Sequence, residues 1–182
     1  MADIVINNKA YDHNFFRGTV VGATKQLETK VSGGGGGGST YRGTGYTAPV
    51  RIQSTTVTHD MIHLADDSGS EHALRLQNWD LTVREEQVLT AVWLVKKGRK
   101  KGPYGAIHNH NLNETDYDKA ALAKMHRSLW MLLVSLAFFF APVSTGIKLL
   151  LVAAGLAFWW YKGVSGRNQL IASGQLLRLA GV

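Results

Sequence analysis

Histidine is the residue type in this sequence that is best suited to metal binding or acid–base chemistry. His59 and His63 are four residues apart in an alternating stretch, so on a strand their side chains share one face. His72 follows a predicted turn and could approach them across a hairpin, and three histidines can hold a zinc ion. No carboxylate stands at a spacing that would orient such ligands. Surface histidines beside a turn are therefore the favoured interpretation, with His59, His63 and His72 as weak metal candidates and no cofactor expected.

Other catalytic signatures are missing from the sequence. It contains no cysteine, which excludes disulfides, a thiolate nucleophile and cysteine-based metal sites. No nucleophile elbow, Walker motif or dinucleotide-binding motif is present. The glycines at 33–38 lack the lysine and the helix start of a phosphate-binding loop, so they indicate a flexible loop or an introduced linker. We therefore expect no enzymatic activity.

The residues before position 113 have the pattern of short strands. Alternating, β-branched segments predict strands at 50–57, 59–65, 73–77, 88–95 and 104–112, and a tight turn at 66–70. Residues 15–31 begin in the same way, after a lead-in at 1–14. Five or more short strands predict a β-rich domain at 15–112, a small barrel or sandwich of SH3-like or OB-like size. We expect a barrel, because closure removes exposed edges.

The excess of positive charge lies in the C-terminal third of the chain. The net charge is +7, but residues 1–118 carry 13 basic and 13 acidic residues, so all of the excess follows residue 118. These late basic residues flank an apolar stretch, which is typical of membrane proteins and argues against nucleic acid as a partner. The expected contacts with lipid headgroups are Lys124, Arg127, Lys162 and Arg167. The basic turn at 96–101 is a second candidate for binding an anion. We favour lipid headgroups over RNA as its ligand, because the apolar stretch already predicts that the chain is at a membrane.

The apolar stretch at 128–163 predicts a transmembrane helical hairpin, preceded by a juxtamembrane helix at 113–127. Pro142 and Gly146 lie at its midpoint and break one long helix into two. Each leg is shorter than the roughly 20 residues that a full crossing needs, so a re-entrant hairpin stays open as an alternative. The aromatic residues expected to anchor it are Trp130, Phe138, Phe139, Phe140, Trp159, Trp160 and Tyr161.

Small residues on the hairpin allow close helix packing, either within one hairpin or between copies. They are Ala137, Ala141, Ala153, Gly155 and Ala157. Short legs also favour clustering, because association relieves hydrophobic mismatch. We therefore expect self-association. The weakly amphipathic residues 164–182 predict a tail on the cytoplasmic membrane surface.

Together these features predict an α+β membrane protein, a cytoplasmic β-domain followed by a C-terminal transmembrane hairpin. The expected function is a membrane-anchored, homo-oligomeric scaffold or interaction module. A small oligomeric channel or transporter component is one alternative, and a membrane-tethered metal-dependent hydrolase that uses the histidines is another. The expected location is a bacterial inner membrane with both termini cytoplasmic. The sequence does not indicate which protein partner the module would bind.

Overall fold

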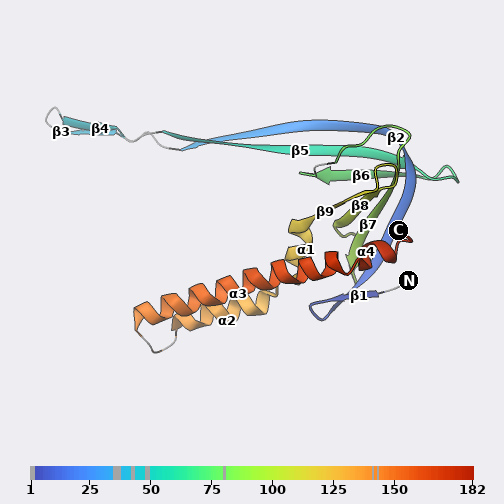
Figure 1. Ribbon diagram of the computed structural model, residues 1–182. Helices are drawn as coiled ribbons and strands as arrows, with labels where there is room; N and C mark the ends of the chain where they lie inside the picture. Colours follow the sequence, from blue (N-terminus) through green and yellow to red (C-terminus); the bar gives the residue numbers. More distant parts are fainter. Residues whose placement is uncertain are drawn as a thin grey trace.

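A computed structural model of the chain describes residues 3–34, 38–41, 44–47, 50–79, 81–140, 142 and 144–182, of which 38–41, 44–47 and Phe138 are described by their backbone alone. Strands come first along the chain and helices follow (Figure 1). The strands are β1 (Asp3–Ile6), β2 (Lys9–Gly34), β3 (Gly38–Tyr41), β4 (Thr44–Thr47), β5 (Arg51–Ala65), β6 (Glu71–Gln77), β7 (Val88–Lys96), β8 (Tyr104–Asn109) and β9 (Glu114–Tyr117). The helices are α1 (Lys119–His126), α2 (Leu129–Ala137), the 3₁₀ turn Phe138–Phe140, α3 (Thr145–Ala172) and α4 (Gln175–Arg178).

In the described part of the chain, the larger antiparallel sheet has the order β6-β5-β2-β7-β8-β9, with β1 also paired to β2. β3 and β4 pair with each other in a separate two-stranded sheet. The outer strands of this order, β6 and β9, belong to opposite ends of the sheet, so it is not a closed barrel. An antiparallel, strand-rich domain is thus confirmed, but the prediction of barrel closure was wrong. The predicted turn at 66–70 is also confirmed, since Asp66 Oδ1 accepts the backbone N–H of Ser68 at 2.9 Å and Gly69 has a φ of +81°.

Apolar side chains are buried on both faces of the sheet. One face packs against α1, the end of α3 and α4, through a cluster that includes Tyr11, Leu94, Leu122, Leu170 and Leu176. The other face curls around a second cluster, which is made by Val20, Ile62, Leu64, Leu74, Leu76, Trp79, Leu89, Ala91 and Ile107. β7 contributes to both clusters, as expected for a strand that is covered on both sides.

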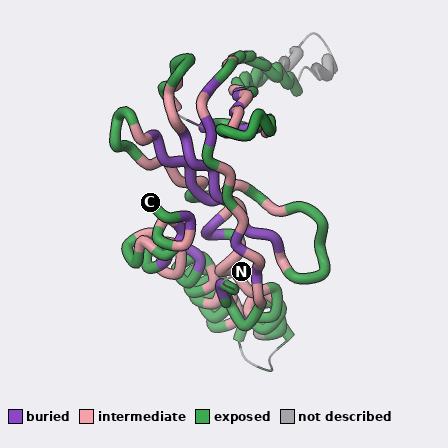
Figure 2. Tube along the Cα trace, turned by 90° about the vertical axis from the view of Figure 1, so that its right-hand side faces the viewer, coloured by how far each residue is buried: buried purple, intermediate pink, exposed green. Residues whose placement is uncertain are grey.

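A long two-stranded ribbon extends beyond the sheet. β2 pairs with β7 only as far as Thr19, and β5 pairs with β6 only from His59 onwards. Residues 27–34 of β2 and 51–58 of β5 continue as a pair with each other, and we call this ribbon the arm. Figure 1 shows the arm projecting far from the sheet, with β3 and β4 beyond its end, and Figure 2 shows that its surface is exposed.

The glycine run differs from the expected flexible loop at the residues that are described. Gly33 and Gly34 are strand residues that pair with Ile52 and Arg51. Gly38 opens β3. Residues 35–37 lie outside the described part of the chain. Pairing with the opposite strand holds these glycines in an extended conformation. The conformational freedom of glycine predicted a loop, because the sequence does not show which strand lies opposite.

The segment predicted as a helix at 113–127 is a strand followed by a short helix. Thr115 lies in β9, where its hydroxyl hydrogen-bonds the His108 ring at 2.8 Å. Asp118 caps α1, because its carboxylate accepts the backbone N–H of Ala121 at 2.8 Å. α1 ends at His126, and Arg127 is extended, so α1 does not run directly into α2.

Candidate functional site

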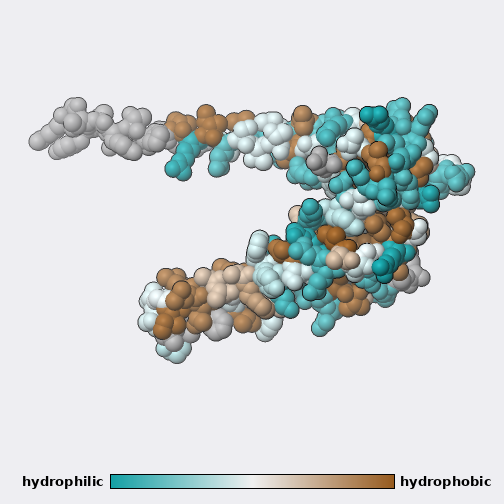
Figure 3. All heavy atoms as spheres, viewed as in Figure 1, coloured by the Kyte–Doolittle hydropathy of each residue, from teal (hydrophilic) through white to brown (hydrophobic). Residues whose placement is uncertain are grey.

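The two apolar helices α2 and α3 lie side by side and project from the sheet as a helical hairpin, which we define as residues 129–161 (Figures 1 and 3). Its outer surface is apolar: Trp130 is 71% exposed, Leu150 72% and Phe140 85%. α3, with 28 residues, is the one helix in the described part of the chain that is long and apolar enough to cross a membrane by length and composition. α2 has 9 residues, so the two legs of the predicted hairpin are unequal and a second span is not supported.

Gly155 brings the two helices of the hairpin into contact. A Cβ atom at Gly155 would collide with the Cβ of Ser135 and would lie 3.2 Å from its Cα. Ser135 is 2% exposed, and its hydroxyl donates to the Leu132 carbonyl at 2.8 Å, so no free polar group is left in the contact. The small residue at 155 therefore serves packing within one hairpin.

A second close contact joins the part of α3 beyond the hairpin to the end of α1. A Cβ atom at Gly163 would lie 2.6 Å from Nε of Arg127, and one at Gly166 would collide with the His126 ring. The Arg127 guanidinium carbon lies 4.8 Å from the centre of the Trp159 ring, and Trp159 Nε1 donates to the Ser128 carbonyl at 3.0 Å. The role of these two glycines was missed from the sequence, where their spacing of three on a helix was the available signal.

The structure distributes the other predicted hairpin residues along its length. Trp160 and Tyr161 are exposed near the middle of α3, and Phe139 and Phe140 are exposed in the 3₁₀ turn that follows α2. Lys162 Nζ lies 5.9 Å from the centre of the Phe158 ring, and Arg167 donates to the Asn168 side chain. Among the small residues, Ala137, Ala153 and Ala157 are exposed. Ala141 and the Phe138 side chain lie outside the described part of the chain.

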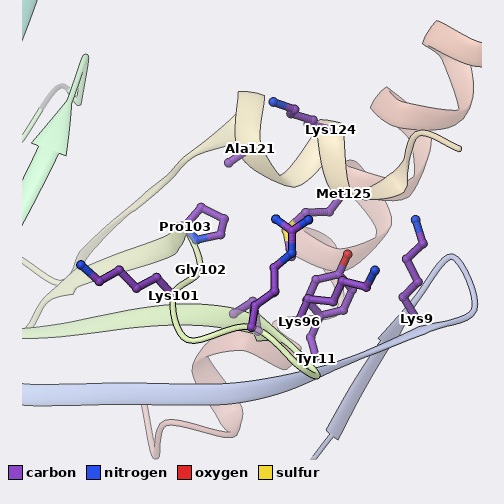
Figure 4. Close-up of a pocket in the computed structure, with 11 residues that line it drawn as sticks. Lys9, Tyr11, Lys96, Lys101, Gly102, Pro103, Ala121, Lys124 and Met125 are labelled. Atoms are coloured by element: carbon purple, nitrogen blue, oxygen red, sulfur yellow. The ribbon is translucent and has the colours of Figure 1, made fainter. Parts of the chain in front are cut away.

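A pocket lined by basic residues lies where the sheet meets α1 (Figure 4). Its volume is about 520 Å³. The cations come from the start of β2, the end of β7, the β7–β8 turn and α1, and they are Lys9, Lys96, Arg99, Lys101 and Lys124. None of the described residues in the lining is acidic. Such a concentration of one sign of charge attracts an anion such as a phosphate group. We call this feature the basic pocket.

Tyr11 and Gly102 shape the basic pocket. The Tyr11 side chain is 7% exposed, and burial raises the pKa of its hydroxyl while the nearby Arg99 charge acts in the opposite direction. It therefore stays a neutral donor at physiological pH. A Cβ at Gly102 would collide with the Leu94 carbonyl oxygen, so glycine lets the turn close against β7. The sequence singled out the turn at 96–101 and Lys124, but it did not connect them with Lys9.

The structure separates the three candidate histidines. His59 and His63 share a face of β5, and His59 Nε2 lies 3.0 Å from the Glu28 carboxylate. His72 pairs with Leu64, which places it on the opposite face. There it stacks between Phe16 and Trp93, each 5.1 Å away between ring centres, and burial lowers its pKa. Within the described part of the chain, no group of three His, Cys, Asp or Glu residues is placed to hold a metal ion.

No family model, curated protein or solved structure matches this chain. The function is therefore inferred from the geometry of the hairpin, the basic pocket and the arm.

Proposed function

We propose that the protein is a membrane-anchored interaction module without catalytic activity, which holds its sheet and arm beside one face of a bilayer. The observation that carries this proposal is the helical hairpin. The segments at its two ends contact each other, because His126 and Arg127 lie against Gly166 and Gly163. The same segments pack on the sheet through Leu122 and Leu170. Its apolar outer surface is exposed, with only 6% of the most apolar stretch of α3 buried. A helix that is apolar all round is stable only when lipid or protein covers it.

Basic side chains near the base of the hairpin support this orientation. Lys124, Arg127 and Lys162 lie where the apolar surface ends, as at the level of anionic headgroups. The basic pocket opens beside α1, which directly precedes the hairpin. The pocket therefore contacts a phosphate-bearing headgroup in this proposal. In this proposal the sheet and both termini lie on the cytoplasmic side, the side that basic flanks favour.

The direction of the arm limits how deep the hairpin inserts. In Figure 3 the arm and the hairpin project from the sheet in the same direction. If the hairpin stood upright in the bilayer, the arm beside it would also enter the hydrocarbon. The arm has charged residues such as Glu28, Lys30 and Arg51, and both of its edges lack a strand partner in the described part of the chain. Charged side chains and unpaired backbone groups are not tolerated in hydrocarbon. The 17 residues from 145 to 161 also span only about 26 Å, less than the roughly 30 Å of hydrocarbon. The hairpin therefore enters as a re-entrant anchor at a shallow angle, and the arm runs along the membrane surface.

Labelling of single cysteines tests the anchor, because the natural chain has none. Lys100→Cys, in the exposed β7–β8 turn, should react with a membrane-impermeant maleimide only from the cytoplasmic face. Ser144→Cys, at the hairpin turn, should stay unlabelled from both faces until detergent is added. Labelling of Ser144→Cys from the outer face would show a full crossing. Release of the protein by alkaline carbonate would overturn membrane anchoring altogether.

The basic pocket has its own expected result. A short-chain phosphatidylglycerol should raise the thermal unfolding midpoint of the detergent-solubilised protein, because a ligand that binds the folded state stabilises it. Phosphatidylcholine and inorganic phosphate at the same concentration should raise it less. Arg99→Glu with Lys101→Glu should abolish the shift, whereas Arg75→Glu, on the exposed side of β6, should keep it. An equal shift in both variants would mean that the lipid acts elsewhere.

A further inference from the structure

The arm leaves both of its outer edges without a strand partner. Within the described part of the chain, nothing pairs with β2 beyond Val20 on the side of β7, or with β5 before Thr58 on the side of β6. An open edge presents a row of N–H and C=O groups that can pair with another strand. An isolated two-stranded ribbon is also only marginally stable in water, and additional strands stabilise it. The arm therefore has the form of an element completed by a partner.

The two faces of the arm differ in chemistry. Residues directly opposite in the register share a face, so Leu27, Thr29 and Val31 lie with Ile52, Ser54, Thr56 and Thr58. On this face Leu27 is 71% exposed, Val31 66% and Ile52 70%. The other face carries charge. Glu28 lies 3.5 Å from Lys30 and 3.0 Å from His59, and these contacts lower the pKa of its carboxyl group.

The order of residues along β2 is complementary to itself. If a second β2 lies antiparallel beside the first with a two-fold axis at Thr29, Glu28 faces Lys30 of the partner subunit, and Lys30 faces Glu28 of the partner subunit. Leu27 faces Val31 of the partner subunit on the apolar face. Both kinds of pair favour antiparallel strands.

Neighbouring registers lose this complementarity. An axis at Glu28 or at Lys30 would place like charges opposite each other, and an axis at Leu27 or Val31 would leave both charges facing uncharged residues. The edge of β5 offers no equivalent, because Arg51 would face only His59, Val57 or Met61 when the axis is at Thr55, Ser54 or Thr56. A β2-to-β5 contact would also not close, because it repeats from copy to copy.

We propose that two copies of the protein pair antiparallel through the outer edges of their β2 strands, with the two-fold axis at Thr29, so that their arms form one four-stranded sheet. This inference rests on the proposed function, in which the arm is the interaction element, and names a second copy as its partner. Pairing satisfies the open β2 edges and sets Leu27 and Val31 of both copies side by side on one face.

Disulfide formation in the cysteine-free chain tests the pairing and its register. Thr29→Cys lies on the proposed axis, so the Cα atoms of the two introduced cysteines should be about 4.5–5.5 Å apart, within the range that a disulfide bridges. Thr56→Cys is the matched control, because Thr56 is the direct partner of Thr29 on the same face of the same arm. Two Thr56 positions would be separated by three strand spacings, about 14 Å. Mild oxidation in native membranes should therefore give a disulfide dimer with Thr29→Cys and none with Thr56→Cys. Equal yields from both would overturn the proposal.

Charge reversal then tests the self-complementarity. In the Thr29→Cys background, Glu28→Lys alone or Lys30→Glu alone should lower the dimer yield several-fold, because each sets like charges opposite each other across the axis. When the two variants are co-expressed with different tags, the mixed dimer should recover, since Lys at 28 and at 30 of one copy faces Glu at 30 and at 28 of the other. The ion pair within each arm stays broken in the mixture, so recovery reports contact between copies.

The outcomes separate this inference from the proposed function. A protein that resists carbonate extraction but gives no Thr29→Cys dimer, or no recovery in the mixture, contradicts the pairing and leaves the anchor standing. A protein that carbonate releases contradicts the anchor, whatever the arms do.

Discussion

Replacing Gly155 with leucine is expected to force α2 away from α3 and to lower the thermal unfolding midpoint of the protein. The nearest atoms to a Cβ at this position belong to Ser135, and its Cα lies 3.2 Å away. Rotation of the Ser135 side chain does not move the Ser135 Cα, so it cannot relieve the contact between this Cα and the new Cβ at position 155. One of the two helices must therefore move. Overpacking of this kind costs about 1–3 kcal/mol. For a chain of this length the midpoint should fall by roughly 3–10 °C.

Ala157→Leu is the matched control for Gly155→Leu. Ala157 is exposed and lies two residues further along α3, so an added side chain there meets lipid rather than α2. Leucine also favours the membrane interior, so insertion should be unaffected in both variants. The comparison is made by circular dichroism of the detergent-solubilised proteins. A larger loss in Ala157→Leu, accompanied by loss of oligomer, would mean that this face of α3 packs between copies, as the sequence alone also allowed.

Local sequence patterns predicted the strands and helices of this fold better than they predicted which elements lie side by side. The alternation around 50–65 correctly indicated strand, and β5 runs through all of Arg51–Ala65. A period of two says which side chains share a face, but it does not say which strand lies alongside. Closure was expected because closure removes edges, and the arm instead leaves the edges of β2 and β5 open. His72 shows the same limit, because the pairing with Leu64 decides its face, and a shift by one residue would reverse it.

Contacts between distant segments account for the parts of the candidate site that the sequence did not reveal. The basic pocket joins Lys9 to Lys124, which are separated by most of the β-domain. The apolar run around Pro142 correctly indicated a break between two helices, but it could not set their lengths, because α3 continues past Tyr161 to Ala172. Beyond Tyr161, α3 packs against both the sheet and α1, so its apolar residues are not confined to one side of the helix. The amphipathic pattern is therefore weak, like that of a segment that lies on a membrane surface.

Leu176→Ala is expected to be the most destabilising single truncation in the C-terminal segment. The Leu176 side chain is 1% exposed and belongs to the cluster that includes Leu94, Leu122 and Leu170. A Cβ at Gly105 of β8 would lie 3.7 Å from its Cδ1, which places Leu176 against this strand of the sheet. Truncation of a buried leucine to alanine costs about 2–5 kcal/mol, because it removes buried apolar surface and leaves a cavity. The expected fall in the unfolding midpoint is about 5–15 °C.

Leu177→Ala supplies the comparison, because Leu177 is the neighbouring leucine and only partly buried. The backbone at 176 is also fixed, since the His13 ring donates from Nε2 to the Leu176 carbonyl at 2.9 Å, so α4 cannot easily move to fill a cavity. The expected signature is a much larger loss of stability for Leu176→Ala than for Leu177→Ala, together with faster proteolytic removal of the last residues. Similar, small losses in both variants would mean that α4 is not docked on the sheet. In that case the C-terminal residues would lie on the membrane surface, as their weakly amphipathic pattern by itself predicts, and the hairpin would be held to the sheet through α1 alone.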